Sequence, residues 1–405
     1  MTSVLKNQSP YVRVVLVGFD QLIAATSNFM VVWLCLTSLP TEAFGSFSYS
    51  WSIIALFVVL SRSLFGIPAL LDSESIDAVE VADTSSSLTG ALVLGILTAI
   101  VTLGLYLMSG ASENEIWILG LFLLAPLILF QDQIRYLIIA TKNIKFAIYL
   151  DLLVLSCILV TVISAKNSEF VGWNLILGLA FGYICASLLF VFRTPISLNL
   201  GNLRTFIKVD FHRRSRLVSD AFLAWGFGLV AITIIRVATG DSGIAIYNGL
   251  IFLFGPVALV TVFLTLALQS EVVRTNGNLA TRHKAWLVLI SLSPILWLMI
   301  VNRLSENFVQ KFLGQSTQDI LANSLPFCIS ALILIGSEVL NLFMRARKLF
   351  SEIAKIRLYS GISTSLILTL GLILNLELTS FIYLLAAGQT IGLLLTVHSL
   401  KASRS

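Results

Sequence analysis

Charged residues are scarce in this chain of 405 residues. Asp, Glu, Lys and Arg together make up 12% of the sequence, hydrophobic residues make up 57%, and the mean hydropathy is +0.95. A soluble globular domain carries about 25% charged residues. Because a surface this poor in charge is unsuited to water, the composition excludes a soluble protein and predicts an integral membrane protein.

Cysteine is also scarce, and its positions exclude a metal site. The four cysteines all fall in apolar segments, and no two of them show the short spacing of metal ligands: Cys35, Cys157, Cys185 and Cys328. Buried thiols of this kind are small packing residues. No phosphate-binding glycine loop, GxGxxG, HExxH or CxxC motif occurs either. We therefore expect no metal, no cofactor and no nucleotide hydrolysis.

A membrane-embedded glycosyl polymerase or ligase is the remaining enzyme class to consider. Such an enzyme needs carboxylates, arginine or histidine gathered around a reaction centre on an outer loop. The longest outer loop, about 303–320, offers Arg303, Glu306 and Asp319 in no recognisable arrangement. The sequence therefore predicts no catalytic residue and a protein that is not an enzyme.

Long apolar runs are abundant. A bilayer core of about 30 Å needs roughly 20 apolar residues of helix. Scanning at that length gives twelve candidate spans: 14–36, 46–68, 85–109, 116–139, 146–165, 173–193, 216–238, 245–269, 285–302, 321–344, 352–374 and 379–400. The predicted fold is an all-helical membrane protein with about twelve transmembrane helices.

The basic residues predict the orientation. With both termini placed in the cytoplasm, 21 of the 26 Lys and Arg residues fall on cytoplasmic loops and helix ends. This agrees with the positive-inside rule. It also accounts for the net charge of +5, since short basic loops lie beside anionic lipid headgroups, and no nucleic-acid partner is needed.

The two halves of the chain resemble each other. Gly45–Tyr49 reads GSFSY and opens the second span, while Gly243–Tyr247 reads GIAIY and opens the eighth. Matches at offsets near 200 residues favour a duplicated six-helix unit. The alternative interpretation is that glycine and tyrosine recur only because they are common at membrane interfaces. The expected organisation is a bundle at 1–193, a basic cytoplasmic linker at 194–215 and a second bundle at 216–405.

Three features of the sequence carry a resemblance to a known family. The first span is polar, the second opens with Phe44-Gly45 and Tyr49, and a basic junction, Ala140-Thr-Lys142, follows the fourth span. In these features the chain resembles the polysaccharide exporters, which belong to the superfamily of multidrug, oligosaccharidyl-lipid and polysaccharide transporters. The resemblance is diffuse but spans the whole chain. It implies two six-helix bundles around a central cavity, and as cargo a sugar unit linked to undecaprenyl diphosphate that crosses the bacterial inner membrane.

Polar residues inside the spans are the candidate site residues, because an ionised side chain at bilayer depth costs about 2.5–3.5 kcal/mol. In the first span, Asp20, Gln21, Ser27 and Asn28 share one helical face. This stripe is interpreted as a cavity wall, with Asp20 as a candidate for binding a coupling ion. The alternative is a hydrogen bond or ion pair between helices.

Arg62 and Arg236 are the two cations assigned inside spans. An anionic diphosphate needs positive charge along its path, and a guanidinium binds phosphate through two hydrogen bonds. The alternative is that both side chains reach the membrane surfaces.

Two further clusters complete the predicted cavity lining. The eighth span contributes Tyr247, Thr261 and Thr265, although threonine often bonds its own backbone. The tenth span contributes Glu338 and Asn341, with Arg345 as an alternative intrahelical partner of Glu338. Asp132 and Arg135 are expected to form a local ion pair, whereas Asp151 is left unassigned, with a nearby basic group as one candidate partner.

The predicted function is translocation of a lipid-linked oligosaccharide across the inner membrane by alternating access. An ion-coupled multidrug or metabolite antiporter of the same superfamily is the alternative. The expected partners are the lipid-linked sugar and membrane lipids, with functional coupling to a polysaccharide polymerase and glycosyltransferases. A monomer is expected.

Overall fold

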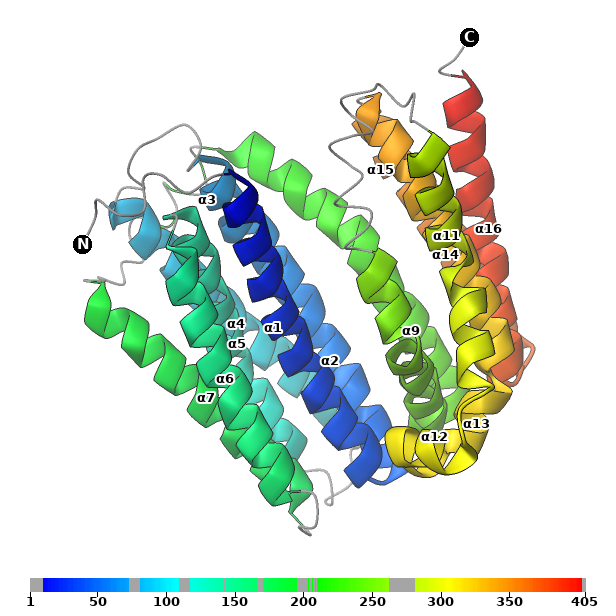
Figure 1. Ribbon diagram of the computed structural model, residues 1–405, viewed down its shortest axis with the longest axis horizontal. Helices are drawn as coiled ribbons and strands as arrows, with labels where there is room; N and C mark the ends of the chain where they lie inside the picture. Colours follow the sequence, from blue (N-terminus) through cyan, green and yellow to red (C-terminus); the bar gives the residue numbers. More distant parts are fainter. Residues whose placement is uncertain are drawn as a thin grey trace. The chain divides into compact units, whose positions relative to one another are not determined.

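The computed structural model describes residues 10–72, 81–108, 117–141, 143–165, 170–194, 203, 206, 208, 210–261, 281–347 and 349–402. Within these ranges the regular structure is helical, and no strand occurs. Ten of the helices there are long and apolar enough to cross a membrane. The predicted class, an all-helical multi-pass membrane protein, is confirmed (Figure 1).

The chain folds into two compact units. Unit 1 contains Met1–Leu39 and Ser50–Phe222, and unit 2 contains Pro40–Tyr49 and Leu223–Ser405. The predicted bundle boundaries at 193 and 215 stay a prediction. A long helix begins at Phe211, which lies inside the predicted linker.

Unit 1 is built around one strongly buried helix. Its elements are α1 (Pro10–Ser38), most of α2 (Thr41–Ser61), η1 (Arg62–Gly66), α3 (Ile67–Asp72), α4 (Val81–Met108), α5 (Trp117–Ala140), α6 (Ile144–Ala165) and α7 (Val171–Arg193). Helix α5 packs against α4, α6, α7, α3 and η1. Polar residues on α5 are therefore enclosed by several helices, whatever lies outside the unit.

The second predicted span is not a uniform α-helix. After Ser61 the chain forms one π-helical turn, η1, in which the N–H of Ile67 donates to the carbonyl of Arg62. A π turn inserts an extra residue and often occurs at functional sites. Here it carries Arg62 at its first position.

Unit 2 contains the greater part of α9 (Phe211–Leu253) and the C-terminal helices. These are α11 (Thr281–Val301), α12 (Glu306–Leu313), η3 (Gly314–Ser316), α13 (Thr317–Ala322), α14 (Ser324–Ala346), α15 (Phe350–Ile373) and α16 (Leu378–Ala402). Helix α14 packs against α11, α15 and α16, and α15 packs against α16. Each predicted span from 285 onwards therefore has its helix.

Helix α9 holds the seventh predicted span and the start of the eighth. Its backbone breaks at Gly240, where φ is 72° and ψ is −171°. This region of backbone space is essentially restricted to glycine. The break therefore marks the boundary between the two predicted spans, 216–238 and 245–269.

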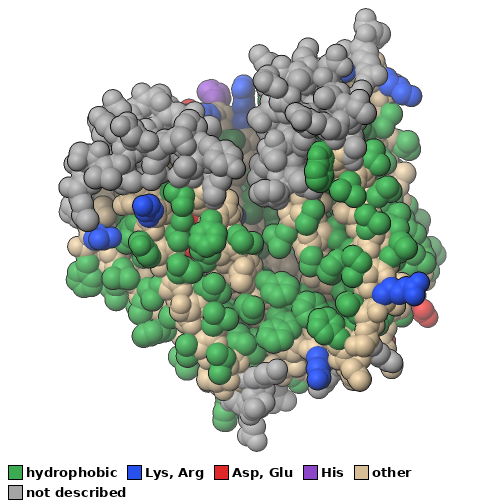
Figure 2. Space-filling view, viewed as in Figure 1, with side chains coloured by type: hydrophobic (Ala, Val, Ile, Leu, Met, Phe, Trp, Pro, Cys, Tyr) green, Lys and Arg blue, Asp and Glu red, His purple; other side chains and the backbone are tan. Residues whose placement is uncertain are grey.

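Hydrophobic side chains dominate the described part of the face shown in Figure 2. Phe192, Ile163 and Leu123 have exposed fractions of 84%, 80% and 72%. In water such a surface would aggregate. In a bilayer it faces lipid tails, which agrees with the composition.

Candidate functional site

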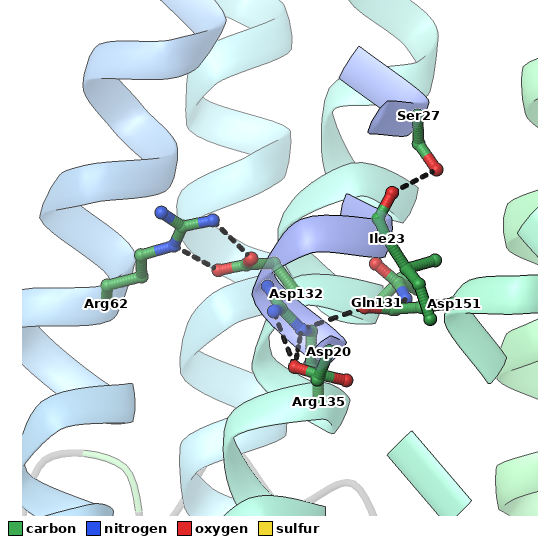
Figure 3. Close-up of polar contacts among 8 residues, drawn as sticks. All are labelled: Asp20, Ile23, Ser27, Arg62, Gln131, Asp132, Arg135 and Asp151. Atoms are coloured by element: carbon green, nitrogen blue, oxygen red, sulfur yellow. Dashed lines mark hydrogen bonds and ion pairs between the residues drawn. The ribbon is translucent and has the colours of Figure 1, made fainter. Parts of the chain in front are cut away.

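Five charged side chains from four elements meet inside unit 1 (Figure 3). They are Asp20 on α1, Arg62 on η1, Asp132 and Arg135 on α5, and Asp151 on α6. The sequence placed the three acids and Arg62 inside spans, and Arg135 at a helix end. The structure shows how the five are paired.

Arg135 is the centre of the buried part. Its Nε and Nη2 donate to one oxygen of Asp20, at 2.8 and 2.5 Å, and its Nε also lies 3.0 Å from Asp151 Oδ2. Asp20 is 0% exposed and Arg135 is 4% exposed. Gln131, one helical turn before Arg135, donates to the other oxygen of Asp151 at 3.3 Å. One guanidinium therefore holds two carboxylates from neighbouring helices.

Arg62 and Asp132 form a second, more accessible pair. Nε and Nη2 of Arg62 donate to the two carboxylate oxygens of Asp132, at 2.9 and 2.7 Å. The guanidinium also lies over the ring of Tyr136, with its carbon 5.7 Å from the ring centroid. The Arg62 side chain keeps 33% of its surface exposed, against 5% for Arg135. Arg62 is thus the charged group of this cluster that a ligand can reach most easily.

The cluster contains one more carboxylate than guanidinium. Asp20, Asp132 and Asp151 face Arg62 and Arg135, which gives a formal charge of minus one. Among the hydrogen bonds of the described residues, none reaches Oδ1 of Asp20. A buried carboxylate oxygen without a donor is costly. The arrangement therefore favours a bound cation or proton over a further anion while all three carboxylates are ionised.

Unit 2 contains a similar pair around the break in α9. Nε and Nη2 of Arg236 donate to the two oxygens of Asp241, at 2.6 and 3.2 Å. The Arg236 guanidinium lies over the ring of Tyr49, 4.4 Å from the centroid. Ser46 donates to Asp241 at 3.1 Å. The side chains of Arg236 and Asp241 are 24% and 28% exposed.

This pair depends on a close approach between two backbones. A Cβ atom at Gly45 would lie only 1.9 Å from the carbonyl oxygen of Asp241. Glycine at position 45 therefore allows the first turns of α2 to reach the start of the helical segment after Gly240. That approach brings Ser46 and Tyr49 to the ion pair.

The polar stripe predicted on the first span is divided between two environments. Asp20 and Ser27 are buried, whereas Gln21 and Asn28 are exposed. The Ser27 hydroxyl donates to the carbonyl of Ile23 at 3.1 Å, which is a bond within α1. Asp20 makes the interhelical ion pair that was the alternative to a cavity wall. Its roles in lining a cavity and binding a coupling ion stay predictions.

The other predicted lining residues are mostly engaged within their own unit. Tyr247 is buried with its ring 5.9 Å from that of Phe327, and Thr261 donates to the carbonyl of Val257 at 2.8 Å. Thr265 lies outside the described residues.

In α14, Asn341 donates to Glu338 at 3.3 Å, and Glu338 lies 3.7 Å from Arg345. The contact with Arg345 that the sequence offered as the alternative for Glu338 is present, and the cavity-lining role of Glu338 and Asn341 stays a prediction.

The predicted ion pair between Asp132 and Arg135 is wrong. The two residues are three apart on α5, but each has a partner from another element: Arg62 for Asp132, and Asp20 with Asp151 for Arg135. A carboxylate that accepts two hydrogen bonds from one guanidinium is stabilised more than one that pairs with a residue three positions along the same helix. Asp151, which the sequence left unassigned, pairs with Arg135.

Asp241 was missed in the sequence because it lies between two predicted spans. The signal was present: an acid five residues after an intramembrane arginine, immediately after a glycine. A helix that breaks at that glycine can turn the carboxylate back toward the arginine.

Comparison with solved structures identifies the fold. Lipid II flippase MurJ in an inward closed conformation aligns with a TM-score of 0.67 and 13% identity, covering 96% of this chain and 87% of that one. The chain therefore shares the fold of this flippase.

A multidrug resistance MATE family transporter of the MOP superfamily, in its inward-facing conformation, aligns with a TM-score of 0.58 and 15% identity, covering 93% of this chain and 95% of that one. MATE in complex with MaL6 also aligns with a TM-score of 0.58, at 13% identity and 99% coverage of both chains. No family model and no curated protein matches the sequence. The likeness is therefore one of fold over nearly the full chain.

Proposed function

We propose that this protein is a transporter that moves a lipid-linked oligosaccharide, carried on undecaprenyl diphosphate, across the bacterial inner membrane by alternating access. The main support is the likeness to a lipid II flippase over 96% of the chain. Arg62 and Arg236 are partly exposed guanidiniums, the group that binds a phosphate through two hydrogen bonds, although each is paired with an aspartate here. Both termini are assigned to the cytoplasm on the distribution of basic residues.

An ion-coupled multidrug or metabolite antiporter is the second candidate. It is favoured by the likeness to MATE transporters and by the extra carboxylate in unit 1. A cluster with a formal charge of minus one suits a bound proton or Na⁺, and Asp20 is the first carboxylate to test for it. Both candidates involve alternating access, and they differ in the cargo.

The decisive experiment uses the full chain in proteoliposomes with two assays on the same preparation. The first follows a fluorescent undecaprenyl-diphosphate oligosaccharide in the inner leaflet and measures its arrival outside with an impermeant lectin. The second follows uptake of a cationic dye while a proton or Na⁺ gradient is applied. Flippase function predicts lectin-accessible sugar that increases with time and no gradient-driven dye movement.

Two variants connect the result to the site. Asp20→Asn and Arg62→Ala are expected to reduce sugar translocation at least tenfold at equal protein level. Dye transport without sugar translocation would favour the antiporter. Full activity of both variants would remove these residues from the mechanism. Coupling to a polymerase and glycosyltransferases, and a monomeric state, remain part of the proposal.

A further inference from the structure

The same three-part arrangement occurs once in each unit. In unit 1, Arg62 is bound by Asp132 and lies over Tyr136. In unit 2, Arg236 is bound by Asp241 and lies over the Tyr49 ring. We call each of these an arginine fork. The two fork arginines are the ones that the sequence assigned inside spans, and both keep substantial exposed surface.

The two forks use the same edge of the guanidinium. In both, Nε and Nη2 donate to the two oxygens of one carboxylate, at distances between 2.6 and 3.2 Å. Among the hydrogen bonds of the described residues, none uses Nη1 of either arginine. A phosphate group binds a guanidinium with this same two-bond geometry. Each aspartate therefore occupies the position on its arginine that a phosphate oxygen pair would take.

Charge decides whether an anion can join the pair or must replace the aspartate. Arg62 with Asp132 is formally neutral, and the neighbouring Asp20, Arg135 and Asp151 add a further charge of minus one. A phosphate added beside an ionised Asp132 would therefore meet net negative charge. If it replaces Asp132 at the fork, the favourable contacts of Arg62 are kept, and the displaced carboxylate, whose side chain is 11% exposed, must turn to water or to another donor.

We propose that Asp132 and Asp241 are specificity-determining residues that close the two arginine forks, and that a phosphate group of the cargo displaces each carboxylate when it binds. This inference rests on the proposed function, because it assumes an anionic diphosphate cargo. The partial exposure of the forks, with arginine side chains at 33% and 24%, gives the phosphate access. The tyrosine rings keep the guanidinium planes oriented when the aspartate leaves.

The test is the affinity of the purified full chain for inorganic diphosphate, measured by isothermal titration calorimetry in lipid nanodiscs. Asp132→Asn removes the competing charge but keeps an acceptor oxygen for Arg62. We expect its Kd to be lower than that of the unchanged protein by about tenfold, which corresponds to about 1.4 kcal/mol. Asp241→Asn is expected to produce a separate gain through Arg236.

Matched variants separate this effect from a general change in charge. Glu352→Gln also removes one carboxylate from an ion pair, an exposed one with Lys355 at 2.8 Å, and should leave the affinity unchanged. Arg62→Ala added to Asp132→Asn should abolish the gain. Arg62→Lys in that background should lose most of the gain in affinity, because lysine keeps the charge but cannot donate two parallel hydrogen bonds to a phosphate.

Asp132→Asn is expected to fold, because the Arg62 side chain is one-third exposed and can be hydrated when its partner is neutral. Asp132→Glu, which keeps the charge, provides a second comparison and should bind no more tightly than the unchanged protein. An unchanged or weaker affinity of folded Asp132→Asn would overturn the proposal, as would a gain that survives Arg62→Ala.

The diphosphate measurement is independent of the cargo assay. If the protein translocates sugar but Asp132→Asn binds diphosphate no more tightly, the proposal that aspartates close the forks is rejected and the proposed function stands. A gain in a protein that moves only cationic dye would reject the flippase and leave an anion site whose ligand is another phosphate compound.

Discussion

Removal of Arg135 should strongly destabilise unit 1. It is 4% exposed and binds two carboxylates, Asp20 and Asp151, which are 0% and 5% exposed. Breaking a buried ion pair by removing one partner costs about 3–5 kcal/mol, because the other charge stays buried and unpaired. Arg135→Leu leaves two buried carboxylates without their basic partner. We therefore expect the free energy of unfolding to fall by about 5 kcal/mol, the upper end of this range.

Asp20→Asn should be milder. Arg135 keeps its contact with Asp151 and can still donate to the amide oxygen of asparagine. The change replaces a charged hydrogen bond by a neutral one, which lowers the free energy of unfolding by about 1–2 kcal/mol.

Replacing Asp20, Arg135 and Asp151 together by leucine removes the whole charged group. By the behaviour of other buried ion networks, this triple variant should be less destabilised than Arg135→Leu alone.

The assay is reversible unfolding of the purified protein in mixed micelles, followed by circular dichroism over a denaturant titration. Ile134→Leu, at the buried position directly before Arg135, serves as the matched control for a leucine on α5, with an expected change below about 1.5 kcal/mol. An Arg135→Leu variant within about 1 kcal/mol of the unchanged protein would refute the reasoning. So would equal losses in Arg135→Leu and Asp20→Asn.

Two glycine substitutions test the geometry of unit 2. Gly45→Ala places a methyl group against the carbonyl of Asp241 and should lower the free energy of unfolding by about 1–3 kcal/mol, whereas Gly18→Ala, with open space around it, should be neutral or stabilising. Gly240→Ala forces alanine into a backbone region used by glycine and should cost about 1–3 kcal/mol, with Gly228→Ala as the unstrained control. Thermal unfolding of the four variants, compared pairwise, checks both; a Gly45→Ala as stable as Gly18→Ala would contradict the close approach.

The fold could be predicted from the sequence because lipid imposes a simple rule. Every spanning helix needs a long apolar run, and such runs can be recognised in the sequence without knowledge of how the helices pack. The break in α9 was also visible as the interval between two predicted spans. The π turn at Arg62 was not, because a single inserted residue leaves the hydropathy unchanged.

The site was predicted only in part. Hydropathy placed Asp20, Arg62 and Arg236 inside the membrane. Which charge pairs with which did not follow, because the partners lie far apart in the chain. Asp20 and Arg135 are 115 residues apart, and Arg62 and Asp132 are 70 apart. Sequence neighbours were favoured instead, and the result was the incorrect pairing of Asp132 with Arg135.

One short segment from the N-terminal half of the chain belongs to unit 2, and this has a consequence for biosynthesis. Residues 40–49 belong to unit 2, yet they are made long before residues 223–405, with which they pack through Ser46 to Asp241 and Thr41 to Ser316. At 5–20 residues per second the ribosome needs roughly 10–35 s to reach the partner helix. During that interval the segment lacks its partners in unit 2, and unit 2 cannot be completed from the C-terminal half alone.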